Sequence, residues 1–247
     1  MIDAPLPTVG RPVRGYVIGS VGIRLPRQRG ELLARREDGV ALHHLVWRLG
    51  PGWRVCASAV LGGGIGPRAW ILNAQVPGGY PRLDPALHLA EIAAAETLDG
   101  PGAGLMTAAD VTAYTVADDD GVTATVTSGL GVRGWAAVPA EGRDGPLPPG
   151  TVNIVVTLPV ALSDAALVNA VATATEAKVQ ALLDAGLDCS GTPTDAVCVA
   201  APDPGGQPGE PFAGPRSRWG ARLARAVHGA VLEGALRQSW DPPAPRP

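Results

Sequence analysis

The sequence is poor in aromatic residues, cysteine and charge. Only 4% of its 247 residues are aromatic, so alanine, valine and leucine must fill the core. The three cysteines, Cys56, Cys189 and Cys198, are an odd number without C-x-x-C spacing, which argues against a disulfide framework and against a zinc site. The small side chains predict closely packed elements, and the cysteine usage predicts a reducing cytoplasm.

Charge and hydropathy exclude two classes of partner. Twenty basic residues stand against 23 acidic ones, for a net charge of -3, and no stripe of Lys and Arg could follow a phosphate backbone. No stretch reaches the roughly 18 apolar residues of a membrane span, and the start, "MIDAPLPTVGRP", does not have the pattern of a signal peptide. We expect a soluble cytoplasmic protein that binds neither nucleic acid nor a membrane.

The order of strand and helix patterns predicts an α+β fold of mixed layers. Residues 41–50 and 53–61 are short β-branched or aromatic runs that look like paired strands, and 69–76 looks like a third. An Asp-Gly turn within 110–130 predicts a hairpin. Further strands are expected in 151–160 and 195–202. We expect a mostly mixed or antiparallel sheet covered by two long helices, about 164–185 and 218–238, and a shorter one, about 85–98.

The length allows one large domain or two small lobes. The Pro- and Gly-rich segment 139–150 has the composition of an exposed linker and marks a possible lobe boundary. We expect a single domain over 1–240 and a disordered tail at 241–247. The oligomeric state stays open, and a homo-oligomer is possible.

A lysine interrupts the apolar face of the helix at 164–185. At 100° per residue the stripe that should face the sheet contains Leu167, Val168, Val171, Val179 and Leu182. Lys178 falls within this stripe, whereas Glu176 points to its far edge. Either Lys178 lays its stem along apolar surface and lifts its ammonium to solvent, or it reaches a polar cleft and stabilises an oxyanion there. Glu176 alone is most simply a solvated helix residue.

The loop "SGTPTDA" places Ser190, Thr192, Thr194 and Asp195 directly before a strand. Hydroxyls and a carboxylate offer both donors and acceptors, so this loop could hold a water, a substrate amide or a ribose. The alternative is a turn closed by Thr and Asp side chains that bond the local backbone. Spacing alone favours the turn.

Several other motifs lack the context that their chemistry needs. "GGGIGPRA" is followed by a strand and not by a helix, so it does not fit dinucleotide binding, and no P-loop is present. His43 and His44 face opposite ways on a strand, and His88 with Glu91 lacks a third ligand, so we expect no metal site. Ser58 and Ser128 lack a G-x-S-x-G elbow. The glycines could allow positive φ or close approach to a bulky ligand.

An ordered series of motifs resembles the adenosylcobinamide amidohydrolase family, the CbiZ proteins of corrinoid salvage. The series spans roughly Trp53 to Ala200, whereas the segment before Trp53 is matched less clearly. One position departs from the family pattern: Pro193 stands where the family has a Gly in its Thr-x-Thr-Asp loop. The motifs are "ASAVLGGGIG", "WILNAQV", "LDP", "GLMTAADV", "VTSGLG", "GTVNIVV", "TATEAKVQAL" and "SGTPTDAVCVA".

The resemblance implies hydrolysis of the amide that joins a corrin side chain to aminopropanol in adenosylcobinamide, which gives adenosylcobyric acid for cobalamin salvage or remodelling. Adenosylcobinamide or a related corrinoid is the expected partner. No cofactor is expected, because cobalt enters only with the substrate. The expected substrate-binding residues are Gly62, Gly63, Gly64, Asn73, Thr107, Ser128, Asn153 and Thr194.

Two mechanisms remain open at this stage. In the first, Asp195 or Glu176 activates a water, and Lys178 or the backbone amides of residues 62–64 stabilise the oxyanion. In the second, Thr192 or Ser128 attacks the carbonyl. A non-catalytic corrinoid-binding module is the alternative function, although the joint presence of Glu176, Lys178, Thr192 and Asp195 favours an enzyme. A nucleotide-dependent kinase is disfavoured without a P-loop.

Overall fold

A computed structural model describes residues 28–137 and 150–239 of the chain. The expected lobe boundary at 139–150 and the expected tail at 241–247 lie almost wholly outside these residues. No helix among the described residues is long and apolar enough to cross a membrane.

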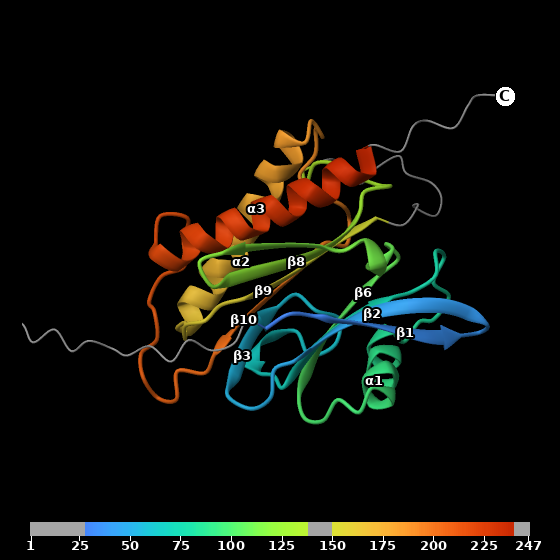
Figure 1. The fold of residues 1–247 in the computed structure, drawn as a ribbon, viewed down its shortest axis with the longest axis horizontal. Coiled ribbons are helices and arrows are strands. Elements are labelled where there is room, and N and C mark those ends of the chain that lie inside the picture. The colour runs from blue at the N-terminus through green and yellow to red at the C-terminus, as the bar shows by residue number, and fades with distance from the viewer. Residues whose placement is uncertain (1–27, 138–149, 240–247) are drawn as a thin grey trace, which may run out of the picture.

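The strands form two sheets, both mixed (Figure 1). The larger sheet has six strands in the order β4-β3-β10-β9-β8-β7, in which only β10 and β9 run parallel. The smaller sheet has four strands in the order β1-β2-β5-β6, in which only β5 and β6 run parallel. The strand bounds are β1 Glu31–Glu37, β2 Val40–Arg48, β3 Trp53–Ala57, β4 Gly64–Pro67, β5 Trp70–Gln75, β6 Gly102–Thr107, β7 Thr115–Asp119, β8 Val122–Gly129, β9 Thr151–Thr157 and β10 Ala196–Pro202.

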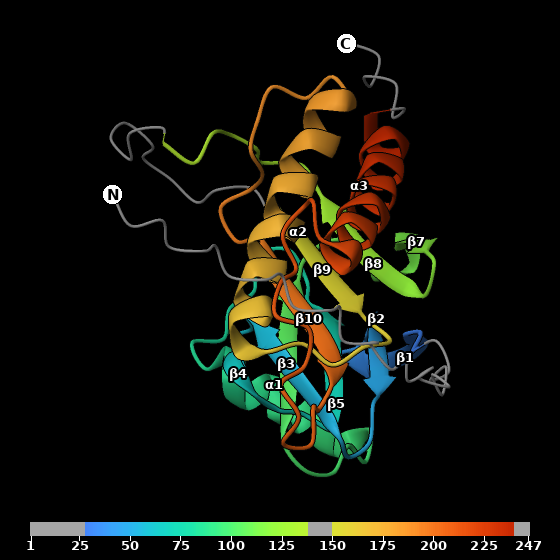
Figure 2. The same ribbon diagram turned by 90° about the vertical axis from the view of Figure 1, so that its left-hand side faces the viewer.

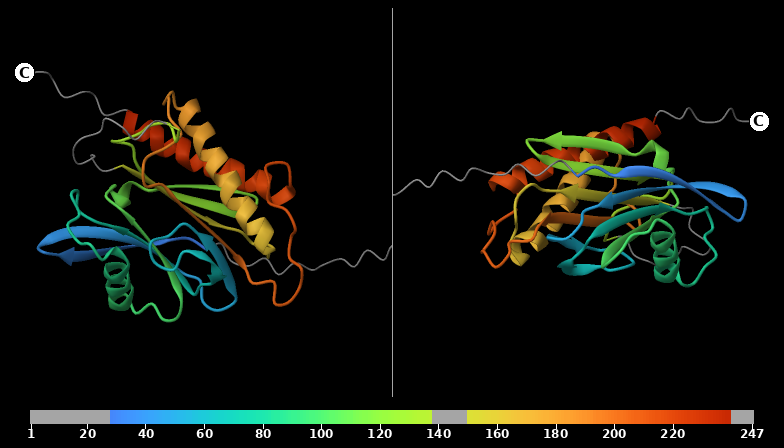
Figure 3. Two further views of the ribbon diagram at one scale, coloured as in Figure 1. Left: turned by 180° about the vertical axis from the view of Figure 1, so that it is seen from behind. Right: turned by 60° about the horizontal axis from the view of Figure 1, so that its bottom comes forward.

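The two sheets stack as the middle layers of a four-layer sandwich. The long helices α2 (Asp164–Asp184) and α3 (Arg218–Ser239) cover one face of the larger sheet, and α1 (Pro85–Ala95) covers the far face of the smaller sheet (Figure 2). Views from behind and from below show the same order of layers (Figure 3). Trp47, Trp53 and Ile71 belong to the apolar core between the sheets.

This architecture confirms the predicted α+β class and adds a second sheet that the sequence did not reveal. The runs expected to pair, now β2 and β3, belong to different sheets: β2 pairs with β1 and β5, and β3 pairs with β4 and β10. That pairing prediction was wrong, because short apolar strands carry no local signal for their partner. The edge strands β1 and β4 and the Gly-rich β6 went unpredicted, since charge and glycine weaken the strand pattern.

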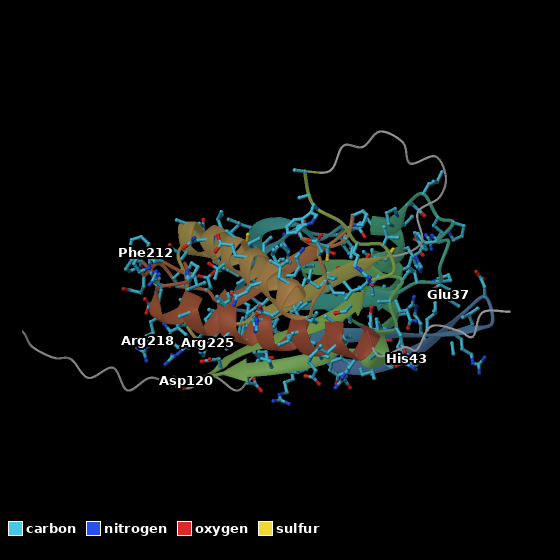
Figure 4. The ribbon with its side chains drawn as sticks, turned by 90° about the horizontal axis from the view of Figure 1, so that it is seen from above. Glu37, His43, Asp120, Phe212, Arg218 and Arg225 are labelled. Atoms are coloured by element: carbon cyan, nitrogen blue, oxygen red, sulfur yellow. The ribbon has the colours of Figure 1, made fainter. Side chains whose placement is uncertain are left out.

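The predicted hairpin is confirmed as β7 and β8. Its two turn residues, Asp120 and Gly121, both have positive φ, as a type I′ turn requires. Arg225 of α3 donates to Asp119 at 2.5 Å, and Arg222 pairs with Asp120. Figure 4 shows Asp120 and Arg225 near one another, far from Glu37 and His43. These ion pairs tie the outer hairpin to α3.

Helix α2 packs on the larger sheet mainly through small side chains. Ser163 caps its first turn by accepting a hydrogen bond from Ala166, and Gly186 follows its end with φ of 78°. The buried face differs from the predicted stripe, because Val168 is exposed and the helix is rotated toward its alanines. The buried residues of α2 are Ala166, Leu167, Ala170, Thr173, Ala174, Ala177, Lys178, Ala181 and Leu182.

We expect Ser163→Ala to lower the free energy of unfolding by about 1 kcal/mol, because an N-terminal amide of α2 loses its acceptor. Chemical denaturation monitored by circular dichroism measures the change. Ser163→Asp is the matched control and should retain wild-type stability, since its carboxylate accepts the same bond and favours the helix N-terminus. Equal stability of Ser163→Ala and wild type would contradict this role.

Candidate active site

Asp195 collects four hydrogen-bond donors just before β10. Its Oδ1 accepts from the Val152 amide at 2.8 Å and from the Thr192 hydroxyl at 2.5 Å. Its Oδ2 accepts from the Thr192 amide at 3.1 Å and from the ammonium of Lys178. A carboxylate offers about four lone-pair positions, so both oxygens of Asp195 are fully engaged. The carboxylate therefore joins α2, β9 and the loop before β10.

Lys178 is buried in this contact. Its side chain is 8% exposed and that of Asp195 11% exposed, so the ion pair is largely removed from water. The structure differs from both interpretations of Lys178 made from the sequence. Its ammonium is not lifted to solvent but is paired with Asp195, and the residue also lines a cavity. Of the 20 basic residues in the chain, 19 are arginines and Lys178 is the one lysine. That uniqueness is a further sequence signal for a site, beside the position of Lys178 on the apolar face of its helix, because a lysine offers a compact point charge that arginine does not.

Gly191 leaves room for the ion pair. Its φ is 151°, and a Cβ at this position would lie 2.1 Å from Asp195 Oδ2 and 2.5 Å from Lys178 Nζ. Any side chain here would collide with both charged groups. The loop residue is thus glycine because the carboxylate and the ammonium occupy the space that a side chain would need.

Two cavities meet at Pro193 and Asp195. The first, here the Lys178 cavity, has a volume of about 620 Å³ and is lined by Trp135, Lys178, Ser190 and Thr192 among others. The second, here the Asn153 cavity, has a volume of about 700 Å³ and includes Ser58, Tyr80, Thr107, Asn153 and Thr194. Both volumes are within the range of small-molecule sites.

The structure brings together most of the predicted polar residues. Thr107 and Asn153 are buried and line the Asn153 cavity, and Thr194 lies at its rim, hydrogen-bonded to Thr151 at 2.6 Å. Asn73 is also buried, but it stands behind Asn153 and donates to Thr127 at 3.0 Å. Asn73 therefore supports the cavity wall without lining it.

The glycine loop does not reach either cavity. Gly62 lines a separate groove beside α1, and a Cβ there would lie 2.0 Å from the carbonyl oxygen of Gly102. The close approach that this glycine permits is to strand β6 of the same chain and not to a ligand. Gly63 and Gly64 are likewise absent from the linings of the two cavities, so the structure gives no basis for an oxyanion site at residues 62–64.

Two further candidates also lie elsewhere. Ser128 follows Thr127 on β8, so strand alternation turns it toward α3, where a Cβ at Gly234 would lie 2.7 Å from its hydroxyl oxygen. Glu176 is exposed on α2 and lines neither cavity. Neither residue is placed to attack a substrate or activate a water in these cavities.

Tyr80 was missed by the sequence reasoning. It lines the Asn153 cavity, and its hydroxyl lies 2.9 Å from Nδ1 of His88, whose Nε2 is 3.1 Å from a carboxylate oxygen of Glu37. Burial is the largest cause that raises the pKa of Tyr80, so its hydroxyl is protonated at neutral pH. The signal was the turn "PGGY" at the end of β5, a weak one because such turns are common.

Cysteine is poorly suited as the nucleophile. Burial raises the pKa of Cys56, Cys189 and Cys198, so their thiols stay protonated and weakly nucleophilic at neutral pH. Within residues 28–137 and 150–239, no group of three or more His, Cys, Asp or Glu side chains is arranged to hold a metal ion. The functional groups that line the two cavities include hydroxyl, amide, carboxylate and ammonium groups.

Comparison with known proteins assigns the chain to a family. The model of the adenosylcobinamide amidohydrolase family, CbiZ, matches residues 30–243, which include both cavities. The chain belongs to this family. A relative from Methanosarcina mazei named adenosylcobinamide amidohydrolase is 33% identical over 184 residues, which cover 72% of this chain and 88% of the relative.

A second CbiZ relative, from Halobacterium salinarum and with the same name, is 43% identical over 112 residues, 43% of this chain and 47% of that protein. The family match begins at Gly30, so it takes in β1 and β2, where the resemblance in sequence motifs was less clear. Both sheets are therefore part of the family's domain.

Breaking the central ion pair should destabilise the fold more than removing both charges. We expect Lys178→Met to lower the free energy of unfolding by about 3 kcal/mol, because it leaves the Asp195 carboxylate buried without a cation. The double variant Lys178→Met/Asp195→Asn should recover more than half of that loss. A double-mutant cycle by chemical denaturation measures the coupling; additive losses would show that the two groups are not coupled.

Proposed function

We propose that this protein hydrolyses the amide bond between the corrin side chain and aminopropanol in adenosylcobinamide. Water is consumed, and adenosylcobyric acid and aminopropanol are released. The observation that carries the proposal is the family match over residues 30–243. No cofactor is needed, since cobalt is part of the substrate. The cytoplasm is the proposed compartment, supported by the three free thiols.

The two cavities suit a large, amide-rich substrate. The Asn153 cavity has apolar walls from Val60, Leu105 and Met106 as well as its hydroxyl and amide groups. The Lys178 cavity continues on the other side of Pro193 and Asp195. A corrinoid seated in the Asn153 cavity could extend its aminopropanol arm past Asp195 into the Lys178 cavity, where the scissile carbonyl would meet Thr192 and Lys178.

Hydrogen bonding favours Thr192 over a water as the attacking group. Asp195 has no free lone pair for a water, because four donors already occupy both oxygens. The hydroxyl oxygen of Thr192 lies 2.5 Å from Asp195 Oδ1 and 2.9 Å from the carbonyl oxygen of Gly150, and the shorter contact directs its single hydrogen toward Asp195. In the proposed step, Thr192 Oγ1 forms a bond to the scissile carbonyl carbon and its proton passes to Asp195.

The remaining steps complete the reaction. Lys178 uses one N–H for Asp195, and its other N–H bonds can face the oxyanion because the ammonium lines the cavity. The C–N bond breaks as the proton held by Asp195 moves to the departing nitrogen. Water then hydrolyses the acyl-threonine, giving the carboxylic acid and regenerating Thr192.

The activity is tested by incubating purified protein with adenosylcobinamide in metal-free buffer. We expect mass analysis to show adenosylcobyric acid and aminopropanol in equal amounts. Heat-denatured protein is the control. A corrinoid that binds without cleavage would favour the alternative function, a corrinoid-binding module, and the absence of both binding and cleavage would reject the proposal.

The nucleophile is tested at Thr192. Thr192→Val should lower kcat by at least about 100-fold, because it removes the attacking oxygen while it keeps the shape of the side chain. Thr192→Ser should retain measurable activity, because it keeps the hydroxyl. If Thr192→Val is folded and retains more than a tenth of wild-type kcat, Thr192 is not the nucleophile and attack by water becomes the mechanism.

A further inference from the structure

Asn153 carries an unpaired buried oxygen in the wall of the larger cavity. The residue is 1% exposed, and its Oδ1 has no hydrogen-bond donor among the described residues. Leaving a buried acceptor without a partner is costly, and such groups in native proteins call for an explanation. Asn153 lines the Asn153 cavity while its Oδ1 is itself closed to solvent, so a ligand in that cavity supplies the missing donor once the wall around this oxygen opens.

The orientation of this amide is determined by its neighbours. Asn153 Nδ2 donates to Asn73 Oδ1 at 2.8 Å and to the carbonyl oxygen of Met106 at 3.1 Å. Asn73 in turn uses its own Nδ2 to donate to Thr127 at 3.0 Å. Turning the Asn153 amide over would place its oxygen against two acceptors. The chain of bonds therefore keeps Oδ1 as the free group.

A free donor lies on β6 of the smaller sheet, opposite β9. Asn153 donates to the carbonyl oxygen of Met106, and Thr107 is the next residue along the strand. Thr107 lines the same cavity as Asn153. Its Oγ1 accepts from the Ala109 amide at 3.0 Å, while its hydroxyl hydrogen has no acceptor within the part of the chain that the structure describes. The cavity lining thus contains one unpaired acceptor on β9 of the larger sheet and one free donor on β6 of the smaller sheet, where the two sheets are joined by the bond from Asn153 to the Met106 carbonyl.

We propose that Asn153 Oδ1 and the Thr107 hydroxyl form a recognition site for a carboxamide of the substrate, the first accepting its N–H and the second donating to its C=O. This inference deepens the proposed function and rests on it. A carboxamide presents both groups side by side, whereas a carboxylate has no N–H to donate. In the proposed mechanism the scissile amide lies beside Thr192 and Lys178, so the amide held in the Asn153 cavity is one of the peripheral amides of the corrin.

The experiment measures binding of adenosylcobinamide, and of an analogue in which an ester replaces the scissile amide, by equilibrium dialysis. Asn153→Leu keeps the approximate volume and removes the acceptor; we expect it to weaken adenosylcobinamide binding by about tenfold or more. Thr115→Val is the matched control. It removes a buried threonine hydroxyl that donates to the Ala230 carbonyl and lines neither cavity, so it should bind within about twofold of wild type.

The ester analogue identifies the amide. Weaker binding of the ester by wild type, with no further loss in Asn153→Leu, would place the scissile amide in the Asn153 cavity and overturn the assignment to a peripheral amide. If a peripheral amide is held, Asn153→Leu weakens both ligands equally while Thr115→Val weakens neither. Binding of both ligands by folded Asn153→Leu within twofold of wild type would overturn the inference.

Thr107→Val gives an independent arm should Asn153→Leu fail to fold. It should also weaken adenosylcobinamide binding, and unchanged binding would count against the pair. Equilibrium dialysis measures binding without turnover, so the recognition site and the amidohydrolase activity are tested independently. Wild type that binds but does not cleave would refute the amidohydrolase and still test the recognition site. Wild type that does not bind would overturn both.

Discussion

The buried pair of Lys178 and Asp195 is the contact on which the site depends. Moving two charges out of water is costly unless each finds a full set of partners. Asp195 meets this need by accepting from a helix, a strand and its own loop, so the same bonds that satisfy the carboxylate also hold Thr192 in place. The same hydrogen bonds therefore position the candidate nucleophile and stabilise the fold.

Successive side chains of β8 and β9 point to opposite faces of the larger sheet, and this places mostly apolar residues on one face and most of the polar residues on the other. Val126 and Ile154 face the helices, whereas Thr127 and Asn153 turn toward the smaller sheet. The bonds of Asn153 to Asn73 and to the Met106 carbonyl join the sheets by polar contacts beside the apolar core. The cavity forms where these contacts reach the edge of the stack.

Local signals predicted the parts of the fold that depend on neighbouring residues. The helix start at Ser163, the stop at Gly186 and the Asp120-Gly121 turn follow from a cap and from backbone preferences. Helix α1 begins with Pro85, which favours a first helical position, although Asp84 before it makes no capping bond with its side chain. Strand partners could not be predicted in this way, because β2 and β3 are equally apolar and their separation into two sheets depends on contacts distant in sequence. The same limit explains why Ser128 and Glu176 were candidates: their chemistry was suitable, but their faces were not visible from the sequence.

The sequence by itself determined the family, the α+β class and the residues Lys178, Thr192, Asp195, Thr107 and Asn153 as candidates for chemistry. It did so because residue type and order are local properties that motifs preserve. Only the tertiary structure decided that Lys178 pairs with Asp195, that Gly62 packs on the chain's own β6, and that Asn153 has a free oxygen. These facts depend on which faces of the two sheets and of α2 pack against each other, and that packing is determined by the whole chain.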